Sequence, residues 1–306
     1  MLDARGRRDD ILRGVAAVND APSDLSTLFS LTVGQADISG VEHGEGLPVV
    51  FLHAGVCDKR MWLSQMQAVA EDGWHAIAYD RRGYGDTESA DEVFDHVDDL
   101  KAVLDQRDIH AAVFVGCSLG GGVAIDFALQ YPGRVLGLVL IGTSVTGAPW
   151  SATNEESAIE MAEDDAWERG DLDLLNKVQA HEWLDGPRSA SGRVGGEVRA
   201  LFLDMNGKAL AKSPLTLEEE RADAWSRLEA VSAPTLLMVG SEDFSAIIDR
   251  HETLSETMPN AFAALLEGVA HIPSIEHPAL VNSLLLQFLD AFDDDDDDPE
   301  DDDPED

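Results

Sequence analysis

The chain has 306 residues, of which 44% are hydrophobic, and its 60 acidic against 21 basic residues give a formal net charge of −39. This length suffices for one large domain with an insertion. The acidic excess argues against binding to nucleic acid or anionic membranes, because both require basic contacts. No run approaches the 18 or so uncharged apolar residues of a transmembrane helix.

The acidic residues are spread along the whole chain. Residues 293–306 contain 12 acidic residues, and the remainder still has 48 acidic against 21 basic. In about 1 M salt the Debye length falls to about 3 Å, so repulsion between these charges would be screened. The composition resembles that of halophilic proteins, and it predicts that this protein functions in a salt-rich cytoplasm. The alternative is an acidic mesophilic protein with a disordered tail.

The two ends of the chain and its cysteines predict little chemistry. Charges stand where a signal peptide needs its apolar segment, so we expect a cytoplasmic protein. We predict residues 1–27 as an N-terminal extension with a short helix over Asp9–Val18, and residues 293–306 as a disordered acidic tail. Cys57 and Cys117 match neither a disulfide framework nor a metal site, and we expect no cofactor and no metal.

Apolar runs and helical spacing alternate along most of the chain, which predicts an α/β fold with a mostly parallel, eight-stranded sheet flanked by helices. Pro48–Leu52, for example, is continuously apolar, as expected of a strand buried on both faces. The other predicted strands are Leu28–Val33, Gln35–Val41, His75–Tyr79, Val113–Val115, Val135–Ile141, Thr235–Val239 and Ala261–Leu266, and the clearest predicted helices are Met61–Ala70, Val93–Gln106 and Ala279–Phe292.

The alternation pauses in the middle of the chain. Residues 149–228 are helical in pattern and acidic, without a convincing strand. We therefore predict a core of residues 28–148 and 229–292, with residues 149–228 inserted as a helical cap. The tryptophans Trp150 and Trp183 are candidates to line a substrate pocket beneath it.

A Gly-x-Ser-x-Gly motif centres on Ser118. The strand Val113–Val115 precedes it, helical spacing follows through Ala128, and Pro132-Gly133 ends that helix. Strand, turn and helix form the context in which this motif describes a nucleophile elbow. The glycines are needed because side chains on both sides of a sharp corner would collide.

Two further residues lie where reactive groups gather in a parallel sheet, beyond the carboxyl ends of strands. Asp243 follows the strand Thr235–Val239, and His271 follows Ala261–Leu266. A serine hydroxyl needs a base to take its proton, and the base needs a third group to orient it. We therefore predict Ser118 as nucleophile, His271 as base and Asp243 as acid.

These assignments have competitors. Asp243 could instead cap a helix, and Glu242 is the nearest alternative acid. His277 and His251 are the alternatives to His271, but His277 precedes Pro278 and is expected to begin the final helix.

Together the motifs resemble the α/β-hydrolase superfamily, in its esterase, lactonase and cofactor-free haloperoxidase branch. Two positions depart from the family pattern: Ala54 stands where glycine is usual after His53, and Ala270 where glycine is usual before the base. The motifs that carry the resemblance are His53-Ala54-Gly55, Asp80-x-Arg82-Gly83-x-Gly85, Gly116-x-Ser118-x-Gly120-Gly121, Gly240-x-x-Asp243, and His271 followed by Glu276-His277-Pro278.

An oxyanion hole requires two backbone N–H groups aimed at the developing negative charge. Leu119, directly after the nucleophile, is expected to supply one. The resemblance implies that Gly55 supplies the other, with Val56 as its neighbour and alternative. We expect His53 to order this loop and residues 80–85 to form an internal salt-bridged corner.

The predicted function is hydrolysis of a small to medium carboxylic ester or lactone through an acyl-enzyme on Ser118. Cys117 is expected to be a small buried residue, because a cysteine nucleophile would stand at position 118. Carbon–carbon bond hydrolysis and cofactor-free perhydrolysis or haloperoxidation with the same triad are the enzymatic alternatives. A non-catalytic ligand-binding protein on the same fold is less favoured because all three residues are present. The sequence leaves the oligomeric state open.

Overall fold

A computed structural model describes residues 27–292, so the predicted helix at Asp9–Val18 and the acidic tail lie outside the described residues. One nine-stranded sheet forms the centre, in the order β1-β2-β4-β3-β6-β7-β8-β9 with β5 paired to β2. Every pair from β4 to β9 along this order is parallel, and the pairs formed by β2 are antiparallel. The strands are β1 (Thr27–Val33), β2 (Ala36–His43), β3 (Pro48–Leu52), β4 (His75–Tyr79), β5 (Glu88–Ser89), β6 (Ala112–Cys117), β7 (Val135–Ile141), β8 (Thr235–Gly240) and β9 (Ala261–Leu266).

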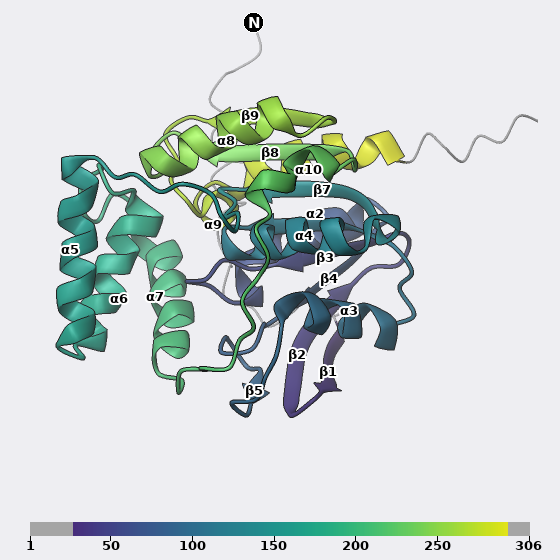
Figure 1. The fold of residues 1–306 in the computed structure, drawn as a ribbon, viewed down its shortest axis with the longest axis horizontal. Coiled ribbons are helices and arrows are strands. Elements are labelled where there is room, and N and C mark those ends of the chain that lie inside the picture. Colours follow the sequence, from purple (N-terminus) through teal and green to yellow (C-terminus); the bar gives the residue numbers. More distant parts are fainter. Residues whose placement is uncertain (1–26, 293–306) are drawn as a thin grey trace, which may run out of the picture.

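Helices cover both faces of this sheet (Figure 1). Apolar side chains of α2 and α10 pack on one face, and those of α3 and α4 on the other. The central strand β6 is buried along its whole length, as expected of a parallel strand between two helical layers. The helices are η1 (Lys59–Trp62), α2 (Leu63–Glu71), α3 (His96–Gln106), α4 (Leu119–Gln130), η2 (Pro132–Arg134), α5 (Asn154–Glu168), α6 (Leu172–Ala180), η3 (His181–Asp185), α7 (Gly196–Leu210), η4 (Trp225–Ala230), α8 (Ser245–Thr257), α9 (Pro273–Glu276), α10 (Pro278–Leu289) and η5 (Asp290–Phe292).

The fold prediction is confirmed, with one correction in the strand count. The sheet has nine strands instead of eight, because β5 pairs with β2 at Asp37 and Ala36. A strand of two residues leaves no apolar alternation in the sequence and forms only where the partner edge is presented to it. Helix α3 begins at His96, not Val93, because Asp95 accepts hydrogen bonds from the N–H groups of the first turn.

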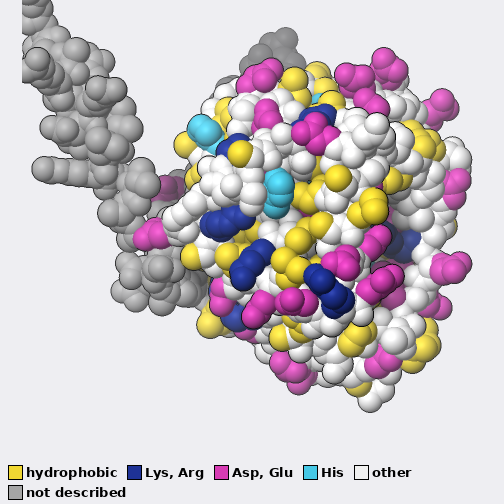
Figure 2. All heavy atoms as spheres, turned by 90° about the vertical axis from the view of Figure 1, so that its left-hand side faces the viewer, with side chains coloured by type: hydrophobic (Ala, Val, Ile, Leu, Met, Phe, Trp, Pro, Cys, Tyr) yellow, Lys and Arg dark blue, Asp and Glu magenta, His cyan; other side chains and the backbone are white. Residues whose placement is uncertain are grey.

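The segment between β7 and β8 holds α5, α6 and α7, which pack on one another beside the sheet (Figure 1). Phe202 and Met205 of α7 join the same apolar cluster as α2. The chain then returns along the core, where Phe94 exchanges main-chain hydrogen bonds with Leu217 and Glu219. Figure 2 shows this side of the molecule, with acidic side chains over much of it and apolar and basic side chains between them.

No helix within residues 27–292 has both the length and the apolar character needed to cross a bilayer.

Candidate active site

Ser118 occupies the sharp turn between β6 and α4. Its backbone has φ +53° and ψ −119°, a region that residues with a side chain rarely adopt. Its N–H donates to the Ile141 carbonyl at 2.9 Å, and its own carbonyl accepts from Gly122 and Ser144, each at 3.1 Å. These bonds on both sides hold the strained conformation.

The glycines of the turn let α4 lie directly against the sheet. A Cβ on Gly116 would stand 2.6 Å from the backbone of Gly121, and one on Gly120 would stand 2.2 Å from the Leu52 carbonyl oxygen. Both distances are far inside van der Waals contact, so larger residues at either position would push the helix away from the strands. The tight turn therefore depends on its glycines.

Asp243 and His271 meet in the loops that follow β8 and β9. His271 Nδ1 lies 2.7 Å from Asp243 Oδ2, and both side chains are buried. The other carboxylate oxygen accepts from the Phe244 N–H at 2.8 Å. Since a carboxylate only accepts, Nδ1 carries the hydrogen and Nε2 holds the lone pair. Among the described residues nothing bonds to Nε2.

The competing residues have other surroundings. Glu242 accepts a hydrogen bond from Ser189 at 2.9 Å. His277 lies between α9 and α10 as the N-cap residue of α10. His251 lies on α8, and burial lowers its pKa. The residue that bonds His271 is Asp243.

Gly142 brings the pair next to Ser118. It directly follows Ile141, whose carbonyl binds the Ser118 N–H, and it has φ +51°. A Cβ on Gly142 would stand 2.9 Å from His271 Nδ1 and 3.2 Å from Asp243 Oδ2. The end of β7 thus binds the Ser118 backbone and lies against the side chains of His271 and Asp243. In the sequence Gly142 was visible only as the residue that ends a strand.

Gly55 and Leu119, the residues predicted to form the oxyanion hole, lie side by side. A Cβ placed on Gly55 would stand 3.8 Å from Leu119 Cδ2 and 3.8 Å from the Tyr84 hydroxyl. Leu119 is the first residue of α4, where backbone N–H groups have no partner within their own helix. The two loops therefore meet beside Ser118.

His53 orders the loop that contains Gly55. Its Nδ1–H donates to the Ala54 carbonyl at 2.7 Å, and its Nε2 accepts from the Arg81 N–H at 3.0 Å. Burial, together with the Arg81 charge, holds the pKa of His53 well below its ordinary value. A neutral ring with both nitrogens engaged holds the loop in place and is not available for proton transfer.

Residues 80–85 form the internal corner that the sequence predicts. Asp80 accepts from the Lys59 ammonium at 2.6 Å and from the Asp86 N–H at 2.7 Å. Arg82 binds both oxygens of Asp99, at 2.8 and 3.0 Å. These buried ion pairs fix the backbone on both sides of Arg81, the residue whose N–H donates to His53.

Cys117 is fully buried, and its Sγ lies 3.5 Å from the His271 carbonyl oxygen. Burial raises the pKa of this thiol and that of Cys57, so both remain protonated. Neither is therefore a nucleophile at neutral pH.

Two tryptophans from the segment between β7 and β8, Trp183 and Trp150, join a cluster of tilted aromatic rings beside His271. The Trp183 ring lies 4.7 Å from the His271 ring and 5.0 Å from that of Phe244, measured between centroids. Trp150 lies one layer farther out, 5.4 Å from Phe244 and 46% exposed. Of the two candidate pocket tryptophans, Trp183 is the one that touches His271.

Comparison with known proteins agrees with this arrangement. The chain is 29% identical over 257 residues to a non-heme chloroperoxidase of Streptomyces lividans, covering 80% of this chain and 92% of that protein. Est816, described as an N-acyl homoserine lactone degrading enzyme, superposes with a TM-score of 0.66 at 25% identity, covering 85% of this chain and 99% of that one. A bromoperoxidase of Bacillus anthracis gives a TM-score of 0.70 at 25% identity, covering 86% and 100%.

A family model described as the alpha/beta hydrolase fold matches residues 48–278, which include Ser118, Asp243 and His271. The match runs from β3 to the start of α10 and thus includes the loops described above. The chain therefore belongs to the α/β-hydrolase family and is an enzyme of the hydrolase class.

Proposed function

We propose that this enzyme is a serine hydrolase that cleaves small to medium carboxylic esters or lactones. One observation carries the proposal: the buried His271–Asp243 pair, 2.7 Å apart, packs on the end of β7 next to the strained Ser118. The similarity to Est816, whose description names a lactone, supports the substrate class. Esters and lactones share the carbonyl carbon that a serine attacks.

In the proposed reaction the Ser118 hydroxyl oxygen attacks the substrate carbonyl while His271 Nε2 accepts its proton. Asp243 accepts from Nδ1–H, which keeps the lone pair on Nε2 and stabilises the imidazolium that forms. The N–H groups of Gly55 and Leu119 stabilise the tetrahedral oxyanion. Collapse of this intermediate expels the alkoxide, which takes the proton from His271 and leaves an acyl-enzyme.

Water completes the proposed cycle. His271 removes a proton from a water molecule as that water attacks the acyl carbon. The second tetrahedral intermediate then collapses to the carboxylic acid, and His271 returns the proton to the departing Ser118 oxygen. For a lactone the alcohol and the acid are released as one hydroxy acid.

We propose residues 149–228 as a cap on a core of residues 28–148 and 229–292, with Trp183 as a wall of the pocket. Its ring lies against His271, so a substrate group bound beside Ser118 would meet it. Lids of this kind exclude water and shape the pocket. We expect Trp183→Leu to change KM most for the longest acyl chains in an ester series.

Perhydrolysis is a second candidate, supported by the likeness to a chloroperoxidase and a bromoperoxidase. In it hydrogen peroxide takes the place of water at the acyl-enzyme and the product is a peracid, which oxidises halide. Peroxide-dependent bromination that requires a carboxylic acid and disappears in Ser118→Ala would favour this reaction over simple hydrolysis.

The main test compares wild type with Ser118→Ala on a panel of p-nitrophenyl esters and lactones, in low and molar KCl. We expect Ser118-dependent turnover and covalent labelling by a fluorophosphonate, and neither in the variant. Ser151→Ala, at an exposed position, is the control. Absence of Ser118-dependent turnover together with absence of labelling would refute the proposal.

A further inference from the structure

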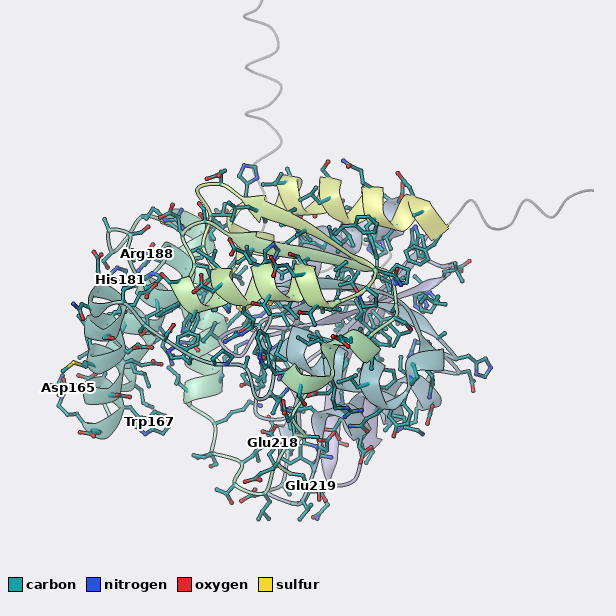
Figure 3. All side chains as sticks on the ribbon, turned by 45° about the horizontal axis from the view of Figure 1, so that its top comes forward. Asp165, Trp167, His181, Arg188, Glu218 and Glu219 are labelled. Atoms are coloured by element: carbon teal, nitrogen blue, oxygen red, sulfur yellow. The ribbon has the colours of Figure 1, made fainter. Side chains whose placement is uncertain are left out.

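The segment that follows η3, residues 186–195, is bonded to both loops that carry the proposed acid and base. It contains two arginines, Arg188 and Arg193. We propose that they form a clasp that holds Asp243 and His271 in register, as positioning residues for the reaction proposed above, on which this inference rests. Figure 3 shows Arg188 near His181 and away from Asp165 and Trp167, which lie near the end of α5.

Arg188 spans the loop that contains Asp243. Its Nη2 donates to the Asp243 carbonyl at 2.9 Å and to the Ser241 carbonyl at 3.3 Å, and its Nη1 donates to the Ser245 hydroxyl at 2.6 Å. One planar guanidinium thus contacts the loop before, at and after the acid. Because the donors of arginine are fixed relative to one another, these contacts restrict the backbone that carries the carboxylate.

Glu156 anchors the same contact from α5. Its fully buried carboxylate accepts from the N–H and the hydroxyl of Ser245, at 2.7 and 2.8 Å, and from the Thr153 N–H at 2.7 Å. Burial raises the pKa of Glu156, but hydrogen bonds from Thr153 and Ser245 more than offset this and hold it below its ordinary value. The carboxylate therefore stays ionised, 3.6 Å from Arg188 Nη1.

Arg193 holds the histidine loop in the same manner. It donates to the Gly268 carbonyl at 2.9 Å and pairs with Glu276. Glu276 in turn accepts from the N–H of Ala270, the residue before His271, at 2.9 Å. On its other side Arg193 donates to the Asp185 carbonyl at 2.6 Å, which ties the loop to the end of η3.

The two arginines add to main-chain bonds that already join the loops. Ser241 N–H donates to the Leu266 carbonyl at 2.9 Å, and Glu242 N–H to the Val269 carbonyl at 3.0 Å. Those bonds fix the strand ends, whereas the clasp fixes the residues from which the two side chains project. We infer that without it the loops remain folded but the Asp243–His271 hydrogen bond lengthens.

The test uses the full chain with Arg188→Gln and Arg193→Gln, together with the Lys variant at each position. Arg169→Gln is the matched control, since Arg169 pairs with Asp165 on the exposed part of α5. We expect kcat on a p-nitrophenyl ester to fall about 10- to 100-fold in each Gln variant with KM within about two-fold, because displacing reacting groups by a fraction of an ångström has this effect. The Lys variants should recover part of the loss.

A second readout does not need turnover. The Nδ1 proton of His271, bonded to Asp243, should give a far-downfield proton NMR signal that weakens or shifts in both Gln variants and is unchanged in Arg169→Gln. Folded Gln variants with wild-type kcat, or with an unchanged signal, would overturn the clasp, as would a wild type that lacks the signal. If Arg188→Gln does not fold, Arg193→Gln and the Lys variants decide the question. A wild type that shows the signal but no Ser118-dependent turnover would refute the proposed function, and the NMR signal of the Gln variants would then decide whether the arginines hold the Asp243–His271 pair.

Discussion

Helices α4 and α5 belong to two regions of this enzyme that are attached in different ways: α4 packs on the central sheet, and α5 lies in the segment between β7 and β8. The helix that follows Ser118, α4, buries nine of its 12 residues, whereas α5, in the segment between β7 and β8, buries three of 15. One of those three is the carboxylate Glu156, which receives hydrogen bonds from α8 and from its own capping box. Apolar burial attaches α4 along most of its length. Helix α5 is attached at fewer points: Ile159 packs in an apolar cluster with Val239 and Phe244, and Glu156 accepts hydrogen bonds from Ser245.

From this difference we expect substitutions in the two regions to have different effects. Removing apolar volume near α4 should lower the free energy of unfolding, because burial of that surface stabilises the fold. Changes in the inserted segment should act more on the geometry of the site, on pH dependence and on salt dependence. The following predictions test this contrast, beginning with the largest expected effect.

Phe114→Ala should destabilise the protein by about 3–5 kcal/mol, since the fully buried ring packs at 5.1 Å on Phe127 of α4 and its loss leaves a cavity. The matched change in α5 is Trp167→Ala, at a side chain that is 61% exposed, for which we expect about 0.5 kcal/mol or less. Urea unfolding measures both. Equal losses would remove the contrast between the two regions.

Gly142→Ala should lower kcat about 100-fold, because a Cβ would press on His271 Nδ1 from 2.9 Å and displace it from Ser118. The positive φ adds a backbone cost of about 1–2 kcal/mol. Gly133→Ala is the control, since a Cβ there meets no atom within 4 Å. A Gly142→Ala enzyme with normal kcat would show that this approach does not position the histidine.

Glu182→Gln should raise stability in alkaline solution. Burial, with the charges of Glu163, Glu160 and Asp164, raises the pKa of Glu182 from 4.5 to about 9. Between these values the unfolded chain has released a proton that the folded chain retains, so stability falls as pH rises. The variant lacks this loss, and we expect its Tm to exceed that of wild type by about 3 °C or more at pH 8.

The Tm difference between Glu182→Gln and wild type should shrink toward pH 5, because the loss of stability accumulates only as pH rises above the ordinary pKa of 4.5. Glu168→Gln, at an exposed carboxyl at the end of α5, is the control. A difference that is constant from pH 5 to pH 9 would contradict the assigned titration.

Salt should stabilise the protein by screening repulsion, if the acidic composition is an adaptation to salt as we propose. The excess of 60 acidic over 21 basic residues predicts a higher Tm in molar KCl than in about 0.05 M KCl, by several degrees. Thermal unfolding in both salts measures this. A Tm that does not rise would refute the adaptation.

Much of the fold could be predicted from local sequence. The bounds of β3, β4 and β7 agree with the apolar runs to the residue, because burial on both faces of a parallel sheet leaves a continuous apolar segment. The bounds of β9 agree as well, although β9 is an edge strand on which Phe262 is 67% exposed. The nine-stranded count could not be predicted, since the pairing of β5 depends on an edge of β2 that lies about 50 residues earlier.

For the site, the sequence by itself determined the candidates: a glycine-flanked Ser118, and Asp243 and His271 beyond strand ends. Local backbone sterics and the geometry of parallel sheets restrict where such residues occur, so a single chain reveals them. Only the tertiary structure decided that Asp243 bonds His271 while Glu242 bonds Ser189, and that Gly142 underlies the pair. The same holds for Arg188 and Arg193, whose contacts with the chain after β8 and β9 join residues 53 to 83 positions apart. Such contacts leave no local pattern, because they arise only when the loops of separate strands meet at one edge of the sheet.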